Sequence, residues 1–256
     1  MNACITLKDS RFNYSYKGFC SIVCAIIDIA LEHYEVYDNL NCSVFESQTL
    51  KLFDNVYEDG DNEYDSGSWW LDRFFQHQLH HSKYNAHTIA NLEDIKLKNK
   101  VLNSILKIKP DKLKKFEEKY SQLNVTDKTL AVQIRGTDKK NEIPEPSIDN
   151  IIKKIDYYFE TTDVQNIFLA TDDIKYLNSL SEKYGDLLVY DKSLLISSDD
   201  TPLHNLPDRD RINEEVLSSV YILSRCSHFL YSFSNVSFLA LILGANDFKT
   251  IMNLNQ

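Results

Sequence analysis

The chain has 256 residues, enough for one large or two small α/β domains, and its apolar content is ordinary for a soluble globular protein. Its formal charge of −10 excludes nucleic acid from the expected partners, because phosphate binding needs clustered Lys and Arg side chains. Five cysteines without a Cys-x-x-Cys pair indicate reduced thiols and a cytoplasmic protein. The apolar segment 19–31 contains Asp28 and is too short to span a bilayer, so no transmembrane segment is expected.

The N-terminal half shows few regular patterns. We expect a helix at residues 18–33, a loop rich in Asp, Asn and Gly at 54–68, and helices after Trp69. Residues 98–120 should be helical on both sides of Pro110. The polar segment that follows predicts a boundary between an N-terminal acceptor-side lobe, residues 1–125, and a C-terminal lobe, residues 126–256.

The C-terminal half alternates strand and helix signals. Apolar segments between the strands show helical spacing at 148–159 and 213–225. Runs typical of buried parallel strands lie at 130–135, 166–171, 187–190, 228–232 and 250–253. Such a βαβ series predicts a Rossmann-like lobe whose ligand lies outside the carboxyl ends of the strands. Two small α/β lobes that face a cleft are the expected architecture.

Polar residues follow three of these strands and should meet at one edge of the sheet. After the first, second and fourth strands stand, respectively, Arg135, then Asp172 with Asp173, and then Ser232, Ser234 and Asn235. An arginine, hydroxyl groups and a helix N-terminus together favour a diphosphate. Each residue also has a purely structural interpretation: the aspartates and Ser234 as helix caps, and Arg135 as an ion-pair partner.

Four segments resemble, in order and approximate spacing, the motifs of the α1,6-fucosyltransferase family. They are residues 132–139 (VQIRGTDK), 167–173 (IFLATDD), 203–205 (LHN) and 229–236 (FLYSFSNV). The resemblance covers residues 129–244. It implies a GT-B-like fold, GDP-fucose as the donor, a glycan hydroxyl as the acceptor, inversion at the anomeric carbon, and no metal ion or other cofactor.

The resemblance also implies roles for individual residues. Arg135 would hold the β-phosphate, and Glu142, or alternatively Glu145, would be the general base. Gly18 and Phe19 resemble the family's glycine-containing loop on the acceptor side. The other donor-binding residues would be Gln133, Asp138, Lys139, Asp172, Asp173, His204, Asn205, Ser219, Ser232, Ser234 and Asn235.

Three positions depart from the family pattern. Gln133 replaces a histidine, Gly136 replaces the second arginine of a pair, and Ser219 stands where the family has an aspartate that reads the base. Recognition of guanine normally needs a carboxylate that accepts hydrogen bonds from the ring N–H groups. A donor with another nucleotide, such as UDP-xylose, therefore stays open.

Two other classes of function compete with this one, a non-catalytic binding module and a metal-dependent enzyme. A non-catalytic module that binds a glycan or nucleotide would keep the fold without the chemistry. A metal-dependent enzyme would use an Asp-x-Asp pair, but neither 208–210 nor 59–61 follows a convincing strand. Aromatic residues that would stack on an acceptor sugar, or more ordinarily pack in the core, are Trp69, Trp70, Phe74 and Phe75.

Overall fold

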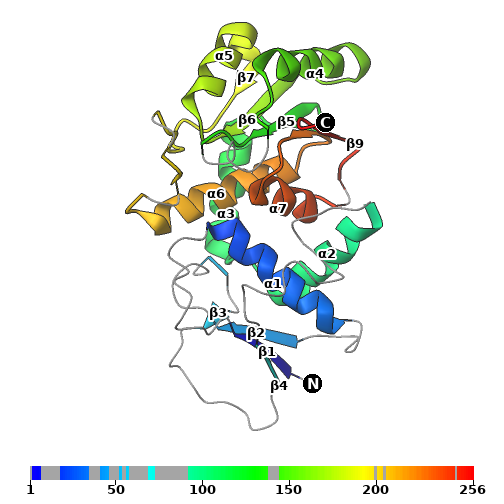
Figure 1. The fold of residues 1–256 in the computed structure, drawn as a ribbon, viewed down its shortest axis with the longest axis vertical. Helices are drawn as coiled ribbons and strands as arrows, with labels where there is room; N and C mark the ends of the chain where they lie inside the picture. The colour runs from blue at the N-terminus through cyan, green and yellow to red at the C-terminus, as the bar shows by residue number, and fades with distance from the viewer. Residues whose placement is uncertain are drawn as a thin grey trace. The chain divides into compact units, whose positions relative to one another are not determined.

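The computed structural model describes residues 2–6, 18–34, 41–45, 52–53, 56–57, 69–72, 92–137, 144–198, 201–203, 206–245 and 247–256. The chain divides into two compact units, Met1–Lys114 and Lys115–Gln256 (Figure 1). The division falls within helix α3 (Pro110–Gln122), upstream of the boundary expected at residue 125. Among the described helices, none combines the length and the apolar content that crossing a membrane requires.

The first unit contains a parallel sheet in the strand order β3-β2-β1-β4. Its strands are β1 (Asn2–Thr6), β2 (Asn41–Phe45), β3 (Val56–Tyr57) and β4 (Trp69–Asp72). β3 lies in the expected loop at 54–68, and β4 begins where helices are expected, so both expectations were wrong there. Their backbones pair with distant strands, and segments this short carry little local signal of that pairing.

Two helices of the first unit pack against each other, α1 (Phe19–Tyr34) and α2 (Leu92–Ile105). The expected helix at 18–33 is thereby confirmed, and its apolar side chains Ile22 and Ile26 are fully buried. The break expected near Pro110 is also confirmed. α3 begins at this proline, whose missing N–H has no intrahelical partner to lose in the first turn.

The second unit has a five-stranded parallel sheet in the order β7-β6-β5-β8-β9. All five predicted strands are confirmed, as β5 (Thr129–Ile134), β6 (Asn166–Thr171), β7 (Leu188–Val189), β8 (His228–Tyr231) and β9 (Thr250–Asn253). Every residue of the central strand β5 is buried. The order of the strands reverses between β5 and β8, and ligands of such sheets bind at this point, outside the carboxyl ends.

Helices cover both faces of this sheet, with α4 and α5 on one side and α6 and α7 on the other (Figure 1). They are α4 (Ile148–Thr161), α5 (Ile174–Tyr184), α6 (Arg209–Ser224) and α7 (Asn235–Leu243), and the short 3₁₀ helix η3 (Gly185–Leu187) precedes β7. Apolar residues of α4 and α5, including Ile151, Ile155 and Leu180, form the core with β5 and β6. Parallel strands joined by helices confirm the predicted α/β class.

Candidate active site

Arg135 follows the last residue of β5 and is held by Asp172, which follows β6. Its Nη1 lies 2.7 Å from Asp172 Oδ2, and the two side chains are 17% and 6% exposed. The same carboxylate accepts hydrogen bonds from Gly136 N at 2.8 Å and from Thr137 Oγ1 at 2.7 Å. Asp172 therefore fixes both the guanidinium group and the turn that carries it.

The turn between β8 and α7 also contacts Arg135, on the β8 side of the point where the strand order reverses. Arg135 N donates to Ser232 Oγ at 2.8 Å, and Ser232 N donates to the carbonyl of Gln133 at 2.9 Å. Ser234 caps α7, because its Oγ accepts a hydrogen bond from Ser237 N at 3.1 Å. Helix α7 thus begins three residues after Ser232, which binds the backbone of Arg135. The partial positive charge of the helix N-terminus favours an anion there.

Gln133 joins these hydroxyl groups into one buried network. Its Oε1 accepts hydrogen bonds from Ser232 Oγ at 3.3 Å, from Ser234 Oγ at 3.0 Å and from Ser237 Oγ. Gln133 is thereby directed into the β8–α7 turn, where it supports the cap of α7. In this structure it is a bracing residue for the predicted phosphate site, and its side-chain oxygen is engaged by protein hydroxyls.

Asp173 caps α5, the helix that follows strand β6. Its Oδ1 accepts a hydrogen bond from Lys175 N at 2.8 Å, which makes it the N-cap of α5. The purely structural interpretation as a helix cap therefore holds for Asp173, whereas its neighbour Asp172 contacts the Arg135 guanidinium group. Gly136 passes so close to Asp173 that an added Cβ would lie 2.5 Å from the Cβ of Asp173. An arginine at this position would therefore require Asp173 or the turn to shift.

Substitution of Gly136 tests this close approach. We expect Gly136→Ala to lower the free energy of unfolding by about 1–3 kcal/mol, because the new methyl group overlaps Asp173. Urea unfolding followed by circular dichroism measures the change. Gly18→Ala is the matched control, since a Cβ at Gly18 meets nothing within 4 Å. Equal stability of both variants would contradict the steric explanation.

Two further residues brace the loops around the site. Glu145 Oε1 accepts hydrogen bonds from Tyr176 Oη at 2.7 Å and from Lys175 Nζ at 3.1 Å. Burial and this hydrogen bond to Glu145 raise the pKa of Tyr176. Asn255, which sequence reasoning missed, accepts from Phe233 N at 2.9 Å and donates to the carbonyl of Pro144 at 2.9 Å. Only its position two residues after the last predicted strand could have pointed to it.

The remaining predicted residues do not all join this cluster. Asp138, Lys139, Glu142, His204 and Asn205 lie outside the described residues, as do Phe74 and Phe75. Asn235 is the first residue of α7. Gly18 and Phe19 belong to the first unit, where Phe19 stacks on Phe53 with ring centroids 6.0 Å apart. Trp69 and Trp70 form strand β4.

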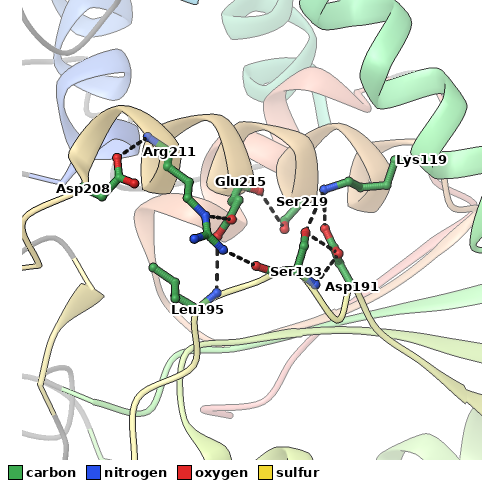
Figure 2. Close-up of polar contacts among 8 residues, drawn as sticks. All are labelled: Lys119, Asp191, Ser193, Leu195, Asp208, Arg211, Glu215 and Ser219. Carbon is green, nitrogen blue, oxygen red and sulfur yellow. Dashed lines mark hydrogen bonds and ion pairs between the residues drawn. The ribbon is translucent and has the colours of Figure 1, made fainter.

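Ser219, the expected base-reading position, lies on α6 in a second polar cluster (Figure 2). Its Oγ donates to the carbonyl of Glu215 at 3.1 Å. Asp208 caps α6 by accepting from Arg211 N at 3.3 Å, so one aspartate of the 208–210 pair has a structural role. Across the helix, Lys119 Nζ contacts Asp191 Oδ2 at 2.5 Å, which draws α3 onto the segment after β7 and lowers the pKa of Asp191 against the effect of burial.

A protein-family model described as alpha-(1,6)-fucosyltransferase N- and catalytic domains matches residues 78–241. A comparison with curated proteins gives no match. Among solved structures, NodZ alpha-1,6-fucosyltransferase soaked with GDP-fucose is similar, with a TM-score of 0.55 and 12% identity over 94% of this chain and 92% of that chain.

Two other solved structures share the architecture. POFUT1 in complex with GDP has a TM-score of 0.52 and 9% identity over 100% of this chain and 98% of that chain. Fucosyltransferase NodZ from Bradyrhizobium has a TM-score of 0.50 and 11% identity over 94% and 91% of the two chains. At such identities the likeness shows the fold, and it confirms the predicted GT-B-like class.

Proposed function

The chain belongs to the alpha-(1,6)-fucosyltransferase N- and catalytic domain family, and we propose that it transfers fucose from GDP-fucose to a glycan hydroxyl, with inversion and without a metal ion. Family membership makes it a glycosyltransferase. The NodZ structure soaked with GDP-fucose and the POFUT1 complex with GDP support the donor. The observation that carries the proposal is Arg135, fixed by Asp172 at the point where the strand order reverses.

The reaction places developing negative charge on the diphosphate. The acceptor oxygen forms a bond to the anomeric carbon while the bond from that carbon to the β-phosphate oxygen breaks, and the electron pair leaves with GDP. Arg135 and the N-terminus of α7 would stabilise this charge. Both groups are held before the donor binds, since Asp172 orients the guanidinium group and Ser234 caps the helix. These fixed charges support a mechanism without a metal ion.

The acceptor hydroxyl must also lose a proton, and a carboxylate is suited to take it. Of the two candidates, Glu145 already accepts hydrogen bonds from Tyr176 and Lys175, which gives it a structural role that joins the segment before α4 to α5. This arrangement favours Glu142 as the general base. The Glu142 carboxylate would take the proton of the acceptor hydroxyl as GDP departs.

Replacement of Glu142 tests the base and the metal independence together. We expect Glu142→Gln to lower the release of GDP from GDP-fucose by about 100-fold or more, because the amide cannot accept the proton. Excess EDTA should leave the wild-type rate unchanged. Glu160→Gln, which alters an exposed carboxylate on α4, should keep wild-type activity.

The possible outcomes separate the parts of the proposal. Inhibition by EDTA that added Mg²⁺ or Mn²⁺ reverses would contradict the metal-independent mechanism. Wild-type activity of Glu142→Gln would remove Glu142 as the base and leave the transfer itself intact. The anomeric configuration of the product, determined by NMR, shows whether the reaction inverts.

A further inference from the structure

We propose that Glu215 takes the place of the family's base-reading aspartate, and that the pocket beside it holds the guanine of the donor. This inference rests on the proposed function, because it concerns the same nucleotide-sugar. Ser219 carries no carboxylate, so its own position cannot supply the acceptor that guanine needs. The structure points to a residue one helical turn earlier.

The pocket lies entirely within the second unit and has a volume of about 350 Å³. Its walls come from α3, α6 and the segment after β7. The lining residues on which the argument depends are Phe116, Lys119, Ser193, Glu215 and Ser218. Seven of its eight lining residues are polar or charged, including Lys115, Arg211 and Glu214, so the pocket suits a polar ligand.

Glu215 presents a fixed carboxylate to this pocket. It is 8% exposed, its Oε1 accepts a hydrogen bond from Arg211 Nε at 2.7 Å, and its Oε2 accepts one from Leu195 N at 3.3 Å. Each carboxylate oxygen can accept a second hydrogen bond. Figure 2 shows Glu215 and Ser219 next to each other on the face of α6 that turns toward Leu195 and Ser193. The carboxylate is thus preorganised close to the expected base-reading position.

Ser218 supplies a second and independent indication of a ligand. Its side chain lines the pocket and is 2% exposed, yet its Oγ has no hydrogen-bond partner among the residues that the structure describes. A buried hydroxyl without a partner is unfavourable by about 1–3 kcal/mol, so such groups commonly mark the position of a missing partner. A polar ligand in the pocket would provide one.

Guanine matches this set of groups better than the other common bases. Its Watson–Crick edge carries two neighbouring donors, N1–H and the 2-amino group, beside the O6 acceptor. A carboxylate can accept both donors in parallel, while a hydroxyl such as that of Ser218 or an ammonium group such as that of Lys119 can donate to O6. Uracil offers one N–H between two carbonyl oxygens, which a carboxylate would repel. Adenine places an acceptor next to its amino group.

The segment after β7 connects this pocket to the predicted phosphate site. Leu195 N donates to Glu215, and two residues later Ser197 N donates to the carbonyl of Asp172 at 2.9 Å. Two residues of extended chain span about 7 Å, so one short segment contacts both the base reader and the residue that holds Arg135. A nucleoside diphosphate can extend over such a separation.

Binding of GDP, IDP and UDP to the full chain tests the inference by isothermal titration calorimetry. IDP lacks only the 2-amino group, so the wild type should bind GDP about tenfold or more tightly than IDP, as loss of a hydrogen bond to a charged acceptor requires. Glu215→Gln should weaken GDP binding about tenfold and abolish the preference over IDP. Glu160→Gln is the matched control, because it removes one exposed carboxylate from α4 and should keep the GDP preference.

A second variant covers the case in which Glu215→Gln does not fold. Ser218→Ala removes a hydroxyl without a partner among the described residues, so the melting temperature without ligand should not fall. The same variant should weaken GDP binding severalfold. If both variants that fold keep the wild-type ratio of GDP to IDP affinity, the inference is overturned while the proposed function stands. If the wild type binds no GDP, both are overturned.

Discussion

Arg135→Ala should lower the rate of GDP release from GDP-fucose by about 100-fold or more, with the fold unchanged in far-UV circular dichroism. The side chain is 17% exposed and lies 2.7 Å from Asp172, so its charge acts at a fixed point near the N-terminus of α7. Loss of one preorganised donor at a developing oxyanion typically lowers kcat by about 10²–10³. The effect should fall mainly on kcat, since the charge on the leaving diphosphate grows in the transition state.

Two variants make this expectation specific. Arg135→Lys should recover only a small part of the activity, because an ammonium group cannot bond Asp172 and a phosphate with the geometry of a guanidinium group. Arg225→Ala is the matched control. Arg225 is 54% exposed and lies 3.8 Å from Asp247, in an ordinary surface ion pair of the same unit. Activity of Arg135→Ala equal to that of Arg225→Ala would show that Arg135 does not act on the diphosphate.

The second unit could be predicted from local sequence patterns because its strands are buried on both faces. Mostly apolar runs such as residues 130–134, in which Gln133 is the one polar residue, indicate such strands, and β5 is buried throughout. Polar residues directly after these runs then fall at one edge of the sheet. This reasoning brings together Arg135, Asp172 and Ser232, and the hydrogen bond from Arg135 N to Ser232 Oγ shows that they meet.

The partners of individual side chains, and strand pairing in the first unit, were beyond this reasoning. The short strands β3 and β4 are defined by their pairing with β2 and β1, and their sequences did not show a strand pattern that stood out from their surroundings. The hydrogen bonds of Gln133 join residues about 100 positions apart. The motif therefore could not show that the side chain of Gln133 is directed toward Ser232 and Ser234. Glu215 was missed for a related reason. It carries the carboxylate one helical turn away from the position that motif alignment selects.

Removal of Asp172 should destabilise the second unit more than any other variant considered for this site. Asp172 is 6% exposed and contacts the Arg135 guanidinium group, Gly136 N and Thr137 Oγ1. Asp172→Ala leaves a largely buried positive charge without this carboxylate, so the free energy of unfolding should fall by about 3–5 kcal/mol. Urea unfolding followed by circular dichroism measures this loss. Asp247→Ala, in the exposed pair, should change stability by less than about 1 kcal/mol.

A double-mutant cycle separates the ion pair from the two neutral hydrogen bonds. In an Arg135→Ala background the guanidinium charge is absent, so Asp172→Ala no longer costs this ion pair and should be less destabilising there by about 1–3 kcal/mol. The remaining loss would come from Gly136 N and Thr137 Oγ1, which keep their need for an acceptor. Equal losses of unfolding free energy in both backgrounds would show that Asp172 stabilises only the turn, through Gly136 N and Thr137 Oγ1. Arg135 would then owe its position to the backbone contact with Ser232 rather than to the carboxylate.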